Sequence, residues 1–335
     1  MKMPRAVRIR WILVLTIAVA AMAATADYKV TKTWKLGGDG GWDYLTVDSD
    51  GHRLFIARAT RVMVVDTDSG KLIGEIPDTP RVHGVALVRD LGRGFISNGG
   101  EDTVSVFDLK TLALEKKIKV GTAPDAIVYD PFSKRVFTFN ARSHDTTAVD
   151  ASKGEVVGKI DLGGKPEFAA SDDQGSMWVN IEDTSELVAF DPVKLAVKSR
   201  WKLSDCEEPT GLSLDRRSRR LFAGCGNKKM AIVNADDGKI VAGPAIGDGC
   251  DATAFDADRG LAFASAGDGT ITVIHEDSPD KFSVIQTVTT QKGARTMAVD
   301  PKTHTLFTVT ANVGPRPERK VEPDSFVVLV VEGAR

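Results

Sequence analysis

Seven positions that recur at steps of 40 to 44 residues could place polar side chains together at one end of a repeated structure. Three are aspartates, and three carboxylates suit a hard cation such as Ca²⁺, which takes oxygen ligands. A histidine and an arginine in the same series suit an anionic group instead. Two purely structural roles stay open: aspartates that cap solvated turns, and an ion pair of Arg295 with Asp251 or Asp43. The series is Asp43, His83, Asp125, Pro166, Thr210, Asp251 and Arg295.

Two further pairs of residues extend this candidate site. Trp42 and Tyr44 follow the glycine-rich run 37–41, where exposed rings would stack on a sugar or a base; packing between structural units is the alternative. His83 and Glu167 are a candidate acid–base pair, and we include Trp42 and Glu167 in the predicted ligand site. The histidines lack zinc-site spacing, and no serine or cysteine nucleophile signature occurs. We therefore predict no catalytic residue, no resident metal and no cofactor, with Ca²⁺ kept as a ligand to be tested.

Short strand-like runs separated by Gly, Asp, Asn and Pro must position these residues. An aromatic residue marks the second strand of each unit, and an Asp precedes it by seven positions in five of the seven units. A period of about 40–45 residues with four strands is the size of a β-propeller blade. The aromatic residues are Phe55, Phe95, Phe137, Trp178, Phe222, Phe263 and Phe307.

The two ends of the chain predict how the ring closes. The last unit has strands near 296–300, 305–311 and 325–331 and then ends, so it lacks a fourth strand. Residues 28–36 resemble the outer strands of other units, and we expect them to complete blade seven and protect its edge. The fold class is therefore all-β, a seven-bladed β-propeller of four-stranded antiparallel blades.

The repeats resemble those of the exported bacterial propellers named after a Tyr-Val-Thr-Asn repeat. The segments 95–98 (Phe-Ile-Ser-Asn) and 137–140 (Phe-Thr-Phe-Asn) match that tetrapeptide in pattern, and 121–124 (Gly-Thr-Ala-Pro) matches the Gly-x-x-Pro blade junction. The unit around Trp178 is one residue short, and the unit around Phe222 keeps only the aromatic residue. The resemblance implies an exported propeller and no single reaction.

The chain has three cysteines, all on one side of the fifth and sixth units. Antiparallel pairing around the turn at 217–218 brings Thr210 opposite Cys225, with Cys206 just beyond. We therefore predict a Cys206–Cys225 disulfide that leaves Cys250 unpaired. A Cys225–Cys250 bridge between neighbouring blades is the alternative.

The N-terminal 26 residues have the layout of a secretory signal peptide: a basic start, an apolar run and small residues before a cleavage point near Ala26. We expect one domain, residues 27–335, in the periplasm or outside the cell; an uncleaved N-terminal anchor is the alternative.

A proline-rich insertion, 313–324, interrupts blade seven. Without residues 1–26, which hold four basic and no acidic residues, the formal net charge falls from −2 to −6. This charge argues against bulk phosphate binding.

These observations favour a non-catalytic binding module. We expect a monomer that holds a partner protein, a peptide or a small polar ligand at the mouth of the channel on the face where the blades are joined, called the top. A sugar-lactone hydrolase using His83, Arg295 and Glu167 is one alternative, and single-stranded nucleic-acid binding is the other. The acidic charge makes nucleic acid the weaker of the two.

Overall fold

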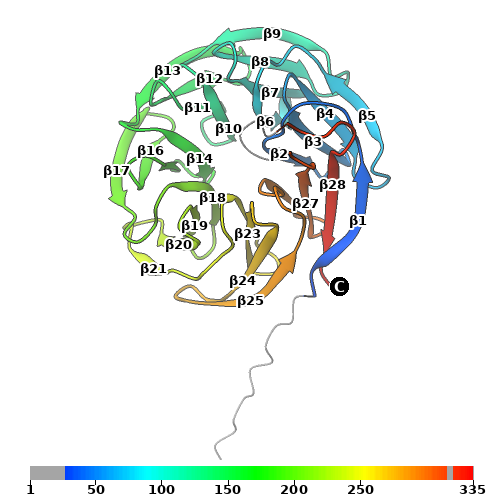
Figure 1. Cartoon of the computed structure of the whole chain (residues 1–335). Coiled ribbons are helices and arrows are strands. Elements are labelled where there is room, and N and C mark those ends of the chain that lie inside the picture. The colour runs from blue at the N-terminus through cyan, green and yellow to red at the C-terminus, as the bar shows by residue number, and fades with distance from the viewer. Residues whose placement is uncertain (1–26, 315–319, 335) are drawn as a thin grey trace, which may run out of the picture.

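The computed structural model describes residues 27–314 and 320–334, and they form seven four-stranded antiparallel sheets arranged in a ring (Figure 1). Within these residues the one helical element is the 3₁₀ turn η1, Arg89–Leu91. Blade one comprises β2 (Leu45–Asp48), β3 (Arg53–Arg58), β4 (Arg61–Asp66) and β5 (Leu72–Ile76). Blade two comprises β6 (Val82–Val88), β7 (Arg93–Asn98), β8 (Thr103–Asp108) and β9 (Leu114–Lys119). Blade three comprises β10 (Pro124–Asp130), β11 (Arg135–Asn140), β12 (Asp145–Asp150) and β13 (Glu155–Asp161).

The remaining blades follow the same order from an inner to an outer strand. Blade four comprises β14 (Pro166–Ser171), β15 (Met177–Ile181), β16 (Glu186–Asp191) and β17 (Ala196–Lys202). Blade five comprises β18 (Pro209–Asp215), β19 (Arg220–Cys225), β20 (Lys229–Asn234) and β21 (Ile240–Ala242). Blade six comprises β22 (Cys250–Asp256), β23 (Leu261–Ala266), β24 (Thr270–Ser278) and β25 (Lys281–Thr289). Blade seven comprises β26 (Met297–Asp300), β27 (Thr305–Thr310), β28 (Val327–Glu332) and β1 (Lys29–Lys35).

The N-terminal strand closes the ring, as predicted from the missing fourth strand. β1 runs antiparallel to β28 at the outside of blade seven, from Lys29 opposite Glu332 to Lys35 opposite Val327 (Figure 1). Without it blade seven would have three strands, so this pairing completes the blade and joins the two ends of the chain within one sheet.

The predicted aromatic repeat forms the core between blades. All seven aromatic residues lie on second strands, and each is at most 2% exposed. Phe137 of blade three, for example, packs against Phe190 of blade four with 5.6 Å between ring centroids. Each blade therefore buries one face against the next, and this inter-blade contact is why the period is so regular.

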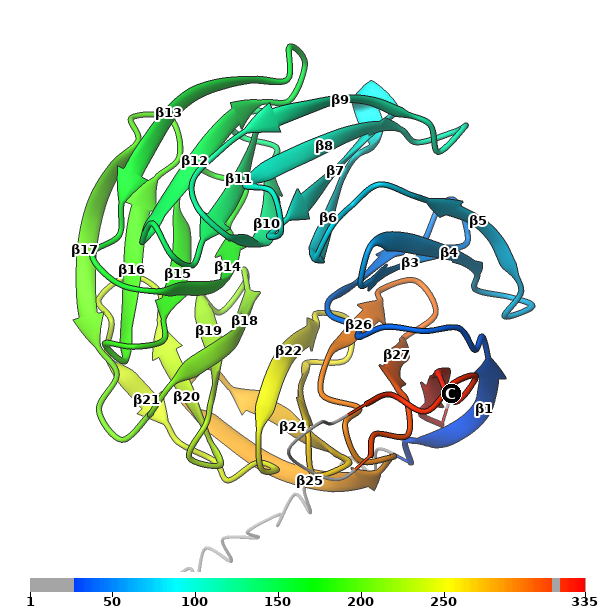
Figure 2. The same ribbon diagram turned by 45° about the horizontal axis from the view of Figure 1, so that its top comes forward.

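The inner strands surround the centre of the ring (Figure 2). Tight turns ending these strands lie on one face, and their Asp side chains accept backbone N–H groups there; Gly51, for example, donates to Asp48 at 2.8 Å. The opposite face carries the loops that join successive blades, and so the first residues of all seven inner strands meet at one mouth.

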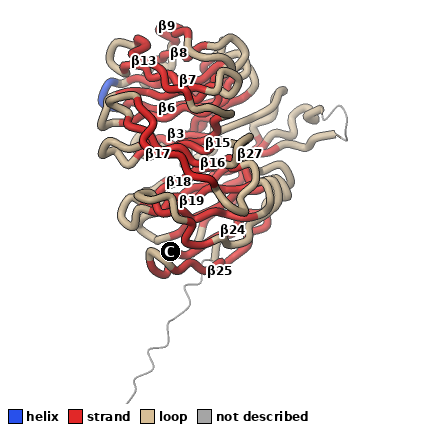
Figure 3. The backbone as a smooth tube through the Cα atoms, turned by 90° about the vertical axis from the view of Figure 1, so that its left-hand side faces the viewer, coloured by secondary structure: helices blue, strands red, loops and turns tan. Residues whose placement is uncertain are grey.

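Blade seven carries the predicted insertion between β27 and β28, and Figure 3 shows the loop segments on either side of its grey part projecting from one face of the ring. Val313 pairs with Val321 and Gly314 donates its N–H to the Lys320 carbonyl at 2.8 Å, so the base of the insertion is a short β-ribbon. Residues 315–319 of the insertion and the predicted signal peptide, 1–26, lie outside the described residues.

The predicted disulfide between Cys206 and Cys225 is present. Cys225 ends β19 opposite Pro209, which brings it beside the loop that holds Cys206. Cys250 is unpaired and buried at the start of β22. In the parts of the chain that the structure describes, no helix has the length and apolar character needed to cross a membrane.

Candidate functional site

An irregularity at the start of five of the seven inner strands redirects the residues that begin those strands. The ladder register shifts between Val82 and Val85 in β6, and equivalent shifts occur in β10, β14, β18 and β22. A bulge of this kind bends a strand and redirects the side chain within it. The residues that follow the first paired position are His83, Asp125, Glu167, Thr210 and Asp251.

Blade four departs from the predicted series by one residue. Pro166 is the first paired residue of β14, as Pro124 is of β10 and Pro209 of β18. The position equivalent to Asp125 is therefore Glu167, whereas the fixed count back from the aromatic residue points to Pro166. The count fails because the segment from Pro166 to Trp178 is one residue shorter than its counterparts in blades three and five.

On one side of the mouth, blades one to three bring together Asp43, His83 and Asp125. His83 Nδ1 lies 2.5 Å from Asp43 Oδ2 and 3.5 Å from Asp125 Oδ1. Their side chains are 15–19% exposed. His83 fits here because residue 99 is glycine: a Cβ at that position would lie 2.7 Å from Nε2. The three side chains thus form a nearly enclosed cluster of hydrogen-bonding and metal-ligating atoms.

The charges of this cluster depend on one another. Burial lowers the pKa of His83, but the hydrogen bond to Asp43 and the charge of Asp125 outweigh it, and the net shift is upward. Burial raises the pKa of Asp125 to about 6, against the opposing effect of His83. The carboxylates thus favour the protonated form of the imidazole, while burial and the charge of Asp43 disfavour ionisation of Asp125.

Across the mouth, Glu167 is held by two blades. Its Oε1 accepts from Lys165 Nζ at 2.9 Å, and its Oε2 accepts from the Tyr44 hydroxyl at 3.4 Å. Lys165 also pairs with Glu182. Burial, with the charge of Asp125, raises the pKa of Glu167 to about 8. The predicted acid–base pair of His83 and Glu167 does not form a hydrogen bond: His83 bonds to Asp43, and Glu167 bonds to Tyr44 and Lys165.

Tyr44 forms the floor of the mouth, a role that the sequence analysis missed. It precedes β2 of blade one, yet its ring packs edge-on against Phe168 in β14 of blade four, 5.0 Å between centroids. Blades one and four are not neighbours in the ring, so this contact crosses the channel. Tyr44 is 7% exposed, so its ring is not the exposed stacking surface for a sugar or a base that we considered from the sequence. Beneath it, the inner strands of blades one to four line a cavity of about 540 Å³.

Asp251 and Arg295 form an ion pair at the third side of the mouth. Arg295 Nη1 lies 3.2 Å from Asp251 Oδ2, which is one of the two pairings left open by the sequence. Burial raises the pKa of Asp251 to about 6 despite the charge of Arg295. Asp251 raises the pKa of Arg295, whose side chain stays 48% exposed. The guanidinium is thus the most accessible charge of the predicted site.

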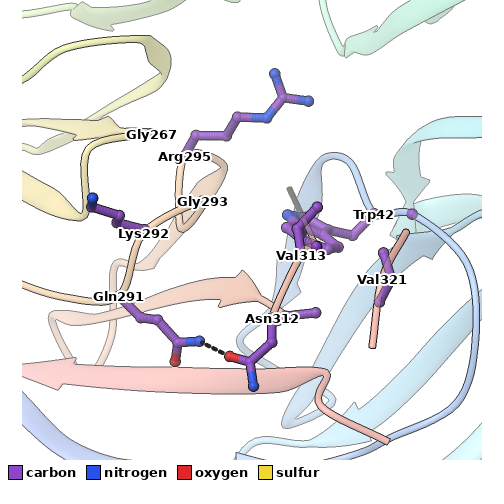
Figure 4. Close-up of a pocket in the computed structure, with 12 residues that line it drawn as sticks. Trp42, Gly267, Gln291, Lys292, Gly293, Arg295, Asn312, Val313 and Val321 are labelled. Carbon is purple, nitrogen blue, oxygen red and sulfur yellow. Dashed lines mark hydrogen bonds between the residues drawn. The ribbon is translucent and has the colours of Figure 1, made fainter. Parts of the chain in front are cut away.

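Trp42 lies beside the mouth in a separate pocket of about 770 Å³ between blades six, seven and one. Its ring packs against Phe326, 5.8 Å between centroids, so packing between structural units explains most of its burial. Figure 4 shows Gln291 and Asn312 joined by a hydrogen bond of 3.2 Å on one side of this pocket, with Arg295 extending on the other. Arg295 therefore lies between the pocket and the mouth.

No protein-family model and no curated protein matches the chain. Among solved structures it is similar to Kuenenia stuttgartiensis hydrazine synthase, with a TM-score of 0.71 at 17% sequence identity, over 81% of this chain and 92% of that one. A likeness at this identity concerns the fold, and it agrees with the ring of seven sheets. The chain is a seven-bladed β-propeller.

Proposed function

We propose that this chain is an exported, non-catalytic binding propeller that holds a small ligand, or a peptide side chain, bearing a positive charge at its top mouth. The observation that carries the proposal is the ring of enclosed acidic side chains above the Tyr44 floor: Asp43, Asp125, Glu167 and Asp251. A closed ring of blades is a rigid support, so the mouth is formed before the ligand arrives and little ordering is needed on binding.

The charge balance of the mouth favours a cationic ligand. Lys165 and Arg295 are each already paired with a carboxylate. Burial holds the pKa values of Asp125 and Asp251 at about 6 and that of Glu167 at about 8. An incoming cation stabilises the ionised carboxylates that burial disfavours, and one pKa unit corresponds to about 1.4 kcal/mol. The same acidic side chains repel a polyanion, which argues against nucleic acid at this mouth.

Two observations support export and membership in the Tyr-Val-Thr-Asn repeat class. The Cys206–Cys225 disulfide is typical of oxidising compartments. The last residue of each matching tetrapeptide joins two strands: Asn98 Nδ2 donates to Ser105 Oγ at 2.8 Å, and Asn140 Nδ2 to Thr147 Oγ1 at 3.0 Å. These bonds explain why asparagine ends the motif.

A thermal-shift comparison tests the proposal. Spermidine, arginine methyl ester and an arginine-containing peptide serve as cationic probes, with citrate as the anionic probe. At 100 times its Kd a ligand adds about 2.7 kcal/mol to the free energy of unfolding. We expect a cationic probe to raise Tm, and the shift to disappear in Glu167→Gln/Asp251→Asn and persist in Asp237→Asn, an exposed turn residue. A response to citrate alone, no response, or a shift unchanged in the double variant overturns the proposal.

Hydrolysis of a sugar lactone at this mouth is the second candidate, favoured by one observation. The 2.5 Å contact between His83 Nδ1 and Asp43 Oδ2 is the arrangement in which a carboxylate orients an imidazole for proton transfer. Gluconolactone opening above the buffer rate, lost in His83→Gln, would support this activity over pure binding. Turnover at the buffer rate removes it.

A further inference from the structure

We infer that Asp43, His83 and Asp125 form a binding site for a divalent transition-metal ion such as Zn²⁺. The inference deepens the proposed function, and it rests on that proposal in taking the top mouth as the place where ligands bind. One oxygen from each carboxylate and one imidazole nitrogen lie within 4.8 Å of one another. The three residues come from three consecutive blades. Among the described residues, no other group of three or more acidic, histidine or cysteine side chains brings its ligand atoms this close together.

The donor atoms favour a borderline ion over Ca²⁺. Zn²⁺ binds imidazole nitrogen and carboxylate oxygen at about 2.0–2.2 Å, whereas Ca²⁺ takes oxygen ligands. Around a tetrahedral ion, neighbouring donors are about 3.4 Å apart. Asp125 already lies 3.5 Å from His83 Nδ1, and Asp43 lies at 2.5 Å. The ion would replace the proton between His83 and Asp43, with release of that proton to solvent and an opening of this one contact by about 1 Å.

The backbone around the three side chains is fixed by hydrogen bonds between blades. Tyr44 N–H, next to Asp43, donates to the His83 carbonyl at 3.1 Å. Ser97 Oγ accepts from Gly84 N–H at 3.0 Å and donates to the Asp125 carbonyl at 2.5 Å. Ser97 thus joins the residue after His83 to Asp125. Such outer contacts hold ligands in place, and their loss typically costs 10–100-fold in metal affinity.

Charge and access also suit an ion. Two ionised carboxylates and a neutral imidazole together carry −2, which one divalent ion balances. The two acidic neighbours outside the cluster, Glu167 and Asp251, are paired with Lys165 and Arg295. Three protein ligands leave a fourth position open toward the channel, as in zinc sites that bind an exogenous group. A carboxylate or water from a ligand at the mouth fits that position.

Direct titration of the EDTA-treated, mature chain with Zn²⁺, Co²⁺ and Ca²⁺ tests the inference by calorimetry. We expect one Zn²⁺ per chain, Ca²⁺ bound at least 100-fold more weakly, and visible Co²⁺ bands of a four-coordinate N/O site. Asp43→Asn and Asp125→Asn should each weaken Zn²⁺ binding at least tenfold, and Ser97→Ala should weaken it while keeping all three ligands. Asp237→Asn, on an exposed turn outside the mouth, is the matched control and should change Zn²⁺ affinity less than threefold.

The outcomes separate this inference from the proposed function. No stoichiometric Zn²⁺ or Co²⁺ binding, or equal binding by the Asp43→Asn/Asp125→Asn variant, overturns the metal site while the cationic-ligand test at Glu167 and Asp251 still stands on its own. Metal binding that depends on Asp43 and Asp125, without any response to the organic cations, overturns the cationic-ligand proposal and keeps the metal site. Circular dichroism of each variant shows that a lost affinity is not a lost fold.

Discussion

Tyr44 of blade one reaches across the central channel and donates a hydrogen bond to Glu167 of blade four, with 3.4 Å between the hydroxyl oxygen and Oε2. The same ring packs on Phe168, the residue after Glu167. One side chain therefore separates the charged mouth from the cavity below it, and joins two blades that share no blade-to-blade interface.

Two substitutions of Tyr44 should lower the free energy of unfolding by different amounts. Tyr44→Phe loses one hydrogen bond to a buried carboxyl group, and we expect about 1 kcal/mol less free energy of unfolding. Tyr44→Ala also removes the ring from its packed site and should cost about 3–5 kcal/mol. Urea unfolding of both variants measures this, with Tyr129→Phe, lower in the same channel, as control. Equal stability of Tyr44→Ala and the parent would show that the ring does not cross the channel.

The burial of the Asp251 carboxyl, which outweighs its pairing with Arg295, predicts a pH-dependent contribution to stability. Below about pH 4 both the folded and the unfolded chain hold the Asp251 proton. Because burial raises the pKa of the folded carboxyl from 3.8 to about 6, the unfolded chain releases its proton first, and the free energy of unfolding falls between pH 4 and 6. Above pH 6 both are ionised and the loss is complete, at most about 3 kcal/mol.

Asp251→Asn removes this titration. The difference in free energy of unfolding, parent minus variant, should therefore fall by about 2–3 kcal/mol from pH 4 to pH 7. Guanidinium unfolding at each pH measures it, and Asp237→Asn on an exposed turn gives the baseline. A difference that stays constant with pH, or that rises, would contradict the raised pKa.

Reduction of the Cys206–Cys225 bond should destabilise blade five. The two cysteines are 19 positions apart, and a crosslink of this span restricts the unfolded chain by about 3 kcal/mol. We expect dithiothreitol to lower Tm in the parent and to have no effect in Cys206→Ser/Cys225→Ser. Burial raises the pKa of the Cys250 thiol, so this thiol should react with a maleimide only after unfolding. A mapped Cys225–Cys250 peptide would contradict the pairing.

Two glycines allow a test of how the N-terminal strand is anchored. Gly70 and Gly92 both have positive φ, 71° and 63°, so alanine costs about 1 kcal/mol or more at each from backbone strain. A Cβ at Gly70 would lie 2.4 Å from the Trp34 ring on β1, whereas a Cβ at Gly92 meets nothing within 4 Å. Gly70→Ala should therefore be less stable than Gly92→Ala by about 1–3 kcal/mol. Equal losses in thermal unfolding would show that Trp34 does not pack there.

The repeat, the number of blades, the closing strand and the disulfide could be predicted from the sequence because each follows from the order of the strands along the chain. Inter-blade packing demands an aromatic residue at nearly the same place in every unit, so Phe55 and Phe307 mark the first and last blades without any knowledge of their contacts. The turn at 217–218 sets the register of β18 and β19, which is enough to bring Cys225 near Cys206.

For the candidate site, the sequence could predict which positions lie near the mouth of the channel, but not which side chains contact one another. The spacing identified Asp43, His83, Asp125, Asp251 and Arg295, but the tertiary structure decided which of them meet: His83 with Asp43 and Asp125, and Asp251 with Arg295. It also put Glu167 in the place where counting put Pro166, and it sent Tyr44 across the channel. The physical reason is that periodicity describes one blade at a time. Contacts across the mouth depend on the curvature of the closed ring and on how far each side chain reaches across it, and the pattern within one blade describes neither.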